Sequence, residues 1–317
     1  MQKRYEEIAA LKGFAMFLVV LGHSIIVYPI NLHENNFFNN LYEFVSTFHL
    51  PLFFIISGYC FSYKDNYKQY ITKKIKRILI PYLIFSLLNI LLRTLVPSLI
   101  NKSDDFVTLL MNVIFNGGEY WFLYTLFMIF VFYPLLYKVN RNKVIAIILE
   151  ILLLIASLLN IKVNMFCITP LLKYLFYFNS GVLIKIYKKD IFENNKNNVI
   201  CTLVAFIILV FIFLLYRKYN LNYLETICAI LGIFFSYLLS GFEYFVRTFK
   251  SFGNNSLQIH LCNDYSLVVS RTIICNITYN PFIIVLFNLF VDYIVVQFVI
   301  EYIIKRSKVL SFSMGIN

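Results

Sequence analysis

Ten long apolar runs, separated by short polar breaks, constrain this 317-residue chain more than any other feature. Hydrophobic residues make up 60% of the sequence, and charged residues only 14%. Runs of this kind cross a bilayer, where only helices and closed barrels satisfy their own backbone hydrogen bonds. No window alternates with the period of two that a barrel strand requires. We therefore expect an all-α polytopic integral membrane protein.

The runs define the expected membrane spans. About ten transmembrane helices are predicted, over 8–27, 44–61, 76–96, 121–137, 143–160, 168–186, 199–216, 224–242, 256–275 and 282–304. The first run contains Lys12 and lacks a small-residue cleavage pattern, which indicates a retained helix rather than a signal peptide. We expect residues 1–317 to form one membrane domain with no appended soluble domain, so any chemistry takes place among the helices.

Basic residues predict the orientation. With both termini cytoplasmic, 20 of the 28 Lys and Arg residues fall in inner segments. Only five then fall in outer segments, and three lie within helices: Arg93, Lys102, Lys162, Arg217 and Lys218 outside, and Lys12, Lys173 and Arg271 within. This bias follows the positive-inside rule, so the net charge of +12 is interpreted as a topology signal and no nucleic-acid partner is expected. The six cysteines form no CxxC pair, and we predict neither a disulfide nor a metal site.

The first span carries two ionisable residues in the stretch LKGFAMFLVVLGHS, residues 11–24. Lys12 and His23 are eleven residues apart, about three helical turns, so they share one face at a separation of roughly 16 Å. Ionisable side chains inside a membrane are costly and mark functional sites. The alternative is that Lys12 reaches the inner headgroups and His23 only packs.

Further polar residues gather at the outer ends of the second and fourth spans. His49 lies at about the depth of His23, and its alternative role is to cap the helix break made by Pro51. Glu119 and Trp121 stand at the mouth of the fourth span. Glu119 could orient an imidazole or be a solvated loop acid, and Trp121 could instead belong to an aromatic belt.

On the inner side, KKIKRILIPYL at residues 73–83 enters the third span with four cations. Most of them are interpreted as topology signals, but Arg77 lies closest to the apolar run and could bind phosphate. The sequence does not identify the partners of the other ionisable residues in the spans: Glu150, Lys173, Asp264, Arg271 and Asp292.

Five segments, in this order and over nearly the full length, resemble the membrane acyltransferase-3 family of O-acyltransferases. They are Lys12 to His23 and Ser24, FHLPLFFIISGYCF, KKIKRILIPYL, YWFLYTLF and GNNSLQIHL. In the first segment the family usually has arginine where this chain has Lys12, which keeps the charge but not the planar fork. In the last segment the family often ends in histidine, whereas this chain has Asn263 there and His260 three residues earlier, so His260 is assigned no catalytic role.

The resemblance implies transfer of an acyl group, commonly acetyl from acetyl-CoA, to a hydroxyl of a surface polysaccharide or lipid-linked saccharide. Acyl-CoA is then a co-substrate, no cofactor is tightly bound, and the setting is a bacterial cytoplasmic membrane. His23 is the expected general base, although it could also carry the acyl group transiently. His49 and Glu119 complete the expected catalytic set, Lys12 and Arg77 bind the donor phosphates, and Trp121 and Ser24 bind substrate.

Two other classes of protein remain compatible with the sequence. A transporter or flippase for a lipid-linked glycan would use intramembrane charges as its pathway, although no internal repeat is evident. A catalytically silent membrane scaffold is the other class, for which lysine at position 12 is slight support.

Overall fold

The computed structural model describes residues 2–26, 32–95, 105–159, 161–163, 165–188, 191 and 198–316, with side chains from Tyr5 onward. Over these residues the chain consists of helices joined by turns, and no strand is present. Seven helical stretches are long and apolar enough to cross a membrane. The expected fold class is confirmed: the protein is an all-α polytopic membrane protein.

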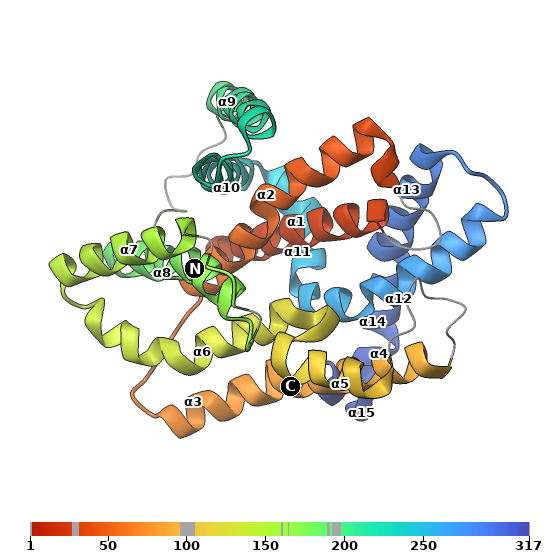
Figure 1. Ribbon diagram of the computed structural model, residues 1–317, viewed down its shortest axis with the longest axis horizontal. Coiled ribbons are helices and arrows are strands. Elements are labelled where there is room, and N and C mark those ends of the chain that lie inside the picture. The colour runs from red at the N-terminus through yellow and green to blue at the C-terminus, as the bar shows by residue number, and fades with distance from the viewer. Residues whose placement is uncertain are drawn as a thin grey trace.

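Helix α1 (Gln2–Ile26) runs through the middle of the bundle (Figure 1). Two thirds of its most apolar window is buried, against 44% or less in the other six apolar stretches. It contacts α2 (Asn36–Tyr59), α10 (Asn222–Leu239), α11 (Glu243–Asn254), α12 (Ser256–Cys275) and α13 (Pro281–Phe290). A side chain on α1 can therefore meet partners from both halves of the chain.

The remaining helices surround this centre in Figure 1. Below α1 lie α3 (Tyr67–Lys74), α4 (Ile80–Leu95), α5 (Phe106–Asn116) and α15 (Lys308–Ser313). To one side are α6 (Trp121–Val139), α7 (Lys143–Leu158) and α8 (Ile168–Tyr187), and α9 (Val199–Tyr219) packs on α10 above. Short helices complete the order: η1 (Leu32–Glu34), η2 (Ile75–Leu79), η4 (Gly118–Tyr120), η5 (Val291–Val296), α14 (Gln297–Tyr302) and η6 (Ile304–Arg306).

Each of the ten expected spans coincides with helical structure where the structure describes it. Seven of them belong to the long apolar stretches, of which one runs from Tyr67 to Leu95 and one from Pro281 to Arg306. The other three, α7, α8 and α12, are not among those stretches. Helix α7 has only 16 residues, while α8 and α12 carry charged side chains within their length.

Two of the regions between the expected spans are partly helical. Helix α2 begins at Asn36, well before the expected residue 44, because the Asn35 side chain accepts hydrogen bonds from the amides of Phe37 and Phe38. The segment 97–120, between two expected spans, contains α5, which ends at Asn116 and is followed by Gly117. With φ at 79°, Gly117 adopts the left-handed conformation that closes a helix and that glycine accepts without strain.

Helix α11 is absent from the expected spans, which treated its region as an inner loop. Its aromatic face, with Phe245 and Phe249, packs edge-on against Phe14 of α1 at centroid distances of 5.3 and 5.4 Å. The two helices approach so closely that a Cβ added at Gly13 would overlap the carbonyl oxygen of Phe249. Helices α2 and α8 cross in the same way, at Gly58 and Gly181. Small residues allow this backbone approach in membrane helices.

Two π-helical turns interrupt the long stretches, η2 and η5. The first includes Arg77 and directly precedes Pro81, which cannot donate a backbone hydrogen bond to the Arg77 carbonyl and whose ring would crowd it. Widening the turn relieves this conflict. Such turns are frequent at functional sites, and η2 places Arg77 in the wall of the cavity described below.

Some residues of the sequence predictions lie outside the described part of the chain. They are the last residues of the expected spans 8–27, 76–96 and 143–160, and the basic residues Lys102, Lys189 and Lys196.

Candidate active site

One cavity of about 640 Å³ follows the central helix through the bundle. It is lined from α1, α2, α3, η2, η4, α6, α8, α10 and α12. Six of the seven site residues expected from the sequence line it: Lys12, His23, His49, Arg77, Glu119 and Trp121. The tertiary structure thus brings together residues from four segments that are up to 109 positions apart in the sequence.

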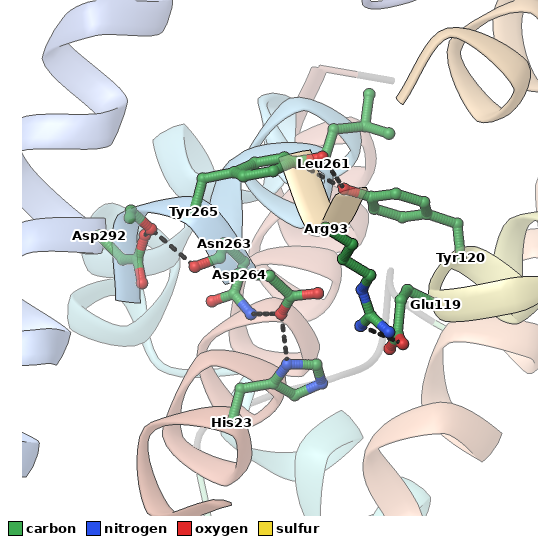
Figure 2. A network of polar contacts seen from close by, with 10 residues as sticks. His23, Arg93, Glu119, Tyr120, Leu261, Asn263, Asp264, Tyr265 and Asp292 are labelled. Carbon is green, nitrogen blue, oxygen red and sulfur yellow. Dashed lines mark hydrogen bonds and ion pairs between the residues drawn. The ribbon is translucent and has the colours of Figure 1, made fainter. Parts of the chain in front are cut away.

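His23 is held by a carboxylate from the far end of the chain. Its Nδ1 lies 2.9 Å from Oδ1 of Asp264 on α12, as Figure 2 shows. Because a carboxylate only accepts hydrogen bonds, Nδ1 carries the proton and the lone pair is left on Nε2. His23 and Asp264 side chains are 35% and 28% exposed, so the pair is reachable from the cavity yet partly shielded from water. This arrangement suits a general base.

Helix α12 also fixes the end of α1 that carries His23. The guanidinium of Arg271, fully buried, donates a hydrogen bond to the carbonyl oxygen of Ser24. A cation at the C-terminal end of a helix satisfies a free carbonyl and complements the helix dipole. The Ser24 hydroxyl itself is buried and donates to the Leu21 carbonyl at 2.7 Å, and Ser24 is not in the cavity lining. The Ser24 hydroxyl is therefore bonded within its own helix, whereas the sequence predicted that Ser24 contacts the substrate.

His49 presents a second imidazole to the cavity. Its Nδ1 donates to the carbonyl of Val45 at 2.8 Å, since a carbonyl oxygen can only accept, so its lone pair is also on Nε2. The carbonyl that Pro51 leaves without its helical partner is that of Thr47, four residues before it. His49 thus does not cap the break made by Pro51. No carboxylate of the described residues forms an ion pair with His49, in contrast to His23.

Glu119 has a different partner from the imidazole that the sequence suggested. Its Oε1 lies 2.5 Å from Nη2 of Arg93, which comes from the C-terminal end of α4 (Figure 2). Asp264, rather than Glu119, is the carboxylate bonded to His23. Glu119 remains a cavity residue as one half of a pair with Arg93.

An aromatic wall stands beside this pair. The ring of Tyr174 stacks on Phe54 at 4.6 Å and lies 6.1 Å from Trp121, with an angle of 27° between the latter two planes. The residue before Tyr174, Lys173, forms an ion pair with Glu225 of α10 at 2.8 Å. Trp121, Tyr174, Lys173 and Glu225 all line the cavity.

At the other end of the cavity, three cations lie together. Lys12 of α1 and Arg77 of η2 were expected there, and Lys74 of α3 joins them. Lys74 is close enough to the other two to interact with them electrostatically, and its ammonium lies 3.6 Å from the ring centre of Phe130. No carboxylate of the described residues is paired with any of the three. Nothing in the sequence distinguishes Lys74 from its neighbours in the basic run.

His260, assigned no role from the sequence, forms part of the cavity wall. Its ring packs nearly at right angles to those of Tyr120 and Phe122, at centroid distances of 6.0 and 5.6 Å.

Asp292 of η5 lies behind the site, fully buried, and accepts a hydrogen bond of 2.5 Å from the Ser266 hydroxyl. These contacts make Asp292 part of the support for α12.

The remaining ionisable residue of the spans, Glu150, belongs to a separate buried network. Its Oε2 accepts from the amide of Asn179 at 2.6 Å, and Asn179 in turn binds Tyr133 and Asn140. This network joins α6, α7 and α8 away from the cavity and is a structural element of the bundle.

Comparison with known proteins assigns the family. The nodulation protein NolL of Mesorhizobium japonicum is 29% identical over 174 residues, which cover 53% of this chain and 44% of that protein. The chain thus spans under half the length of this curated relative. No solved structure matches the chain. Residues 5–303 match the acyltransferase domain family, and since this is nearly the whole sequence, the chain belongs to the acyltransferase-3 family of membrane acyltransferases.

Proposed function

We propose that this protein transfers an acyl group, acetyl in the first instance, from acyl-CoA to a hydroxyl of a cell-surface or lipid-linked sugar. The observation that carries the proposal is one cavity that has, at one end, three cations with no carboxylate partner among the described residues, and the His23–Asp264 pair farther along. The cations suit an anionic donor, and the imidazole suits deprotonation of a hydroxyl. The proposed setting is a bacterial cytoplasmic membrane with the cation end facing the cytoplasm.

The donor would enter at Lys12, Lys74 and Arg77. The phosphates of CoA are multiply charged, and cations without a carboxylate partner within the described residues are available to them. Because α1 is one helix from Gln2 to Ile26, Lys12 and His23 lie about 16 Å apart along it. The pantetheine arm would follow this face and bring the thioester to His23.

His23 would act as the general base. Its Nε2 takes the proton of the acceptor hydroxyl, and the alkoxide oxygen attacks the thioester carbonyl to form a tetrahedral intermediate. The C–S bond then breaks, the new ester is released, and the CoA thiolate takes the proton back from Nε2. Asp264 stabilises the imidazolium that exists between the two proton transfers and keeps the ring in one orientation.

The test is release of free CoA from acetyl-CoA by the purified protein, with and without a panel of surface glycans. His23→Ala is expected to lower acceptor-dependent release by at least 100-fold, the order of magnitude of general-base catalysis. His33→Ala is the matched control, because His33 is another histidine of an outer segment that does not line the cavity. Equal release by wild type and His23→Ala would overturn the proposed role of His23.

The same assay separates direct transfer from an acyl-histidine intermediate. Direct transfer gives no CoA without acceptor, whereas an acylated His23 gives a burst equal to the number of enzyme molecules. We expect no burst, since in the proposed mechanism the acyl group passes directly from the thioester to the acceptor hydroxyl. A stoichiometric burst that disappears in His23→Ala would replace the general base with a covalent mechanism.

A further inference from the structure

The acceptor end of the cavity contains an ion pair whose role the reaction above does not explain. Lys173 of α8 and Glu225 of α10 meet at 2.8 Å, and both line the cavity. A paired charge among membrane helices gains little stability over apolar side chains of the same size, because desolvation offsets the attraction. Ionisable side chains that face a cavity in a membrane protein mark a ligand pathway.

The surroundings of this pair match the chemistry of a sugar ring. Tyr174 and Trp121 provide aromatic surface directly beside Lys173, whose ammonium lies 5.9 Å from the Tyr174 ring centre. The C–H face of a sugar packs against aromatic rings, while its hydroxyls both donate and accept hydrogen bonds. An ammonium supplies donors and a carboxylate supplies acceptors, so the pair can both donate hydrogen bonds to hydroxyls and accept them from hydroxyls.

The charges at this end are balanced, unlike those at the donor end. Lys173 is paired with Glu225, and Glu119 is paired with Arg93. An acidic sugar would meet two carboxylates and would find each of these cations already neutralised. A neutral sugar carries no charge that the two carboxylates would repel.

We propose that the Lys173–Glu225 pair is the acceptor subsite and selects neutral, polyhydroxylated sugars over acidic ones. Glu225 accepts from one or two sugar hydroxyls, Lys173 donates to another, and the ring lies along Trp121 and Tyr174. This inference rests on the proposed function for its reaction, but the binding of the sugar can be measured without turnover.

Trp121 is the only tryptophan of the chain and lies in the cavity, so its fluorescence reports sugar binding directly. The protein is to be kept in an amphipol, since glycoside detergents carry the same chemistry as the proposed ligand. The probes are a neutral hexose oligomer and the uronic-acid oligomer of the same linkage. The wild type is expected to bind the neutral oligomer more tightly.

The decisive variant is Glu225→Gln, which keeps the shape of the side chain and leaves Lys173 with an unneutralised charge. The Kd and acceptor KM for the neutral oligomer should rise about tenfold. The affinity for the acidic oligomer relative to that for the neutral oligomer should rise as well. The KM for acetyl-CoA should not change. The double exchange Lys173→Glu with Glu225→Lys should restore much of the neutral binding.

The matched control is the pair Arg217 and Glu43, which joins α9 to α2 and does not line the cavity. Glu43→Gln should leave both Kd values and their ratio unchanged. A structural role for Lys173–Glu225 would instead lower thermal stability and move donor and acceptor KM together, without a change in the acidic-to-neutral ratio. That result would overturn the acceptor subsite.

Failure of the proposed transferase reaction and failure of the proposed subsite give different results. If the wild type binds the neutral oligomer and Glu225→Gln inverts the preference, the subsite stands even when no CoA is released. In the converse case, CoA is released in a His23-dependent way while Glu225→Gln leaves the preference for the neutral oligomer unaltered. That result supports the transferase reaction and contradicts the acceptor subsite.

Discussion

His23 and Asp264 are the residues whose pairing defines the site. They are 241 positions apart, and the hydrogen bond of 2.9 Å between them fixes which ring nitrogen faces the cavity. His49 has the same tautomer through the Val45 carbonyl but lacks an acid partner within the described residues. A carbonyl dipole stabilises an imidazolium far less than a carboxylate does, so His23 is the better base.

The substitution Asp264→Asn tests this pairing at the scale of single residues. The amide can keep a hydrogen bond to Nδ1 but cannot balance the charge of the imidazolium, and kcat is expected to fall on the order of 100-fold. The measurement is acetyl-CoA turnover at saturating donor and acceptor.

The comparison variant is Glu119→Gln, which removes a charge of the same sign from the cavity lining. Because Glu119 is paired with Arg93 at 2.5 Å and is not bonded to His23, we expect kcat to change by less than about tenfold. A larger loss of kcat in Glu119→Gln than in Asp264→Asn would indicate that Glu119, and not Asp264, is the catalytic carboxylate.

At the scale of helices, α1 is positioned by close backbone contacts. A Cβ at Gly13 would overlap the Phe249 carbonyl of α11, and one at Gly253 would overlap the Ala9 carbonyl of α1. Helix α11 thus holds the donor half of α1, and Arg271 of α12 holds the other end at Ser24. Fixing both ends of this helix holds Lys12 and His23 in place relative to the helices around them.

Gly13→Ala and Gly253→Ala should therefore each destabilise the protein by about 1–3 kcal/mol, because a backbone carbonyl cannot move aside as a flexible side chain can. The measurement is the thermal unfolding midpoint of the purified protein. The double variant should lose less than the sum, since the two glycines share one contact.

Gly22→Ala is the control on the same helix. Its added Cβ would meet only the Tyr42 ring at 3.7 and 3.8 Å, which is ordinary contact, and the midpoint should stay close to that of wild type. Equal losses in all three variants would mean that the close crossing with α11 does not control stability, because alanine favours the helix over glycine and cannot lose stability through helix propensity.

At the scale of the whole molecule, the cavity separates charge along its length. The donor end has Lys12, Lys74 and Arg77 without carboxylate partners among the described residues, and the acceptor end has the pairs Lys173–Glu225 and Arg93–Glu119. A cation cluster attracts an anionic donor, and a balanced end admits a neutral acceptor. In the proposed reaction, the two substrates would approach from opposite ends and meet at His23.

Neutralising the donor end should weaken acyl-CoA binding. Lys12→Gln, Lys74→Gln and Arg77→Gln are each expected to raise the acyl-CoA KM by about tenfold, while the acceptor KM stays constant. High salt should reduce the difference from wild type, because exposed charges are screened. The measurement is the donor KM at two ionic strengths.

Lys73→Gln is the control for this set. Lys73 precedes Lys74 in the same basic run but is exposed and does not line the cavity, so its donor KM should match the wild type. A similar rise for Lys73→Gln would indicate attraction by the basic surface in general and not a built donor site.

The sequence by itself determined the helical membrane fold, the approximate positions of the long apolar helices and six of the residues that line the cavity. Apolar runs of spanning length have few alternatives in lipid, and isolated polar residues within them are conspicuous because burial in the membrane is costly. The sequence missed α11, although its phenylalanines recur at helical spacing, because a short amphipathic helix has no run of spanning length.

Only the tertiary structure decided which polar groups meet. The bonds from Asp264 to His23 and from Arg271 to Ser24 join residues more than 240 positions apart, and the pair Lys173–Glu225 joins separate helices. Periodicity fixes the face of one helix on which a residue lies, but the rotation and crossing of a second helix depend on packing, here on glycines against backbone carbonyls. For that reason the sequence could name both His23 and Asp264 without pairing them.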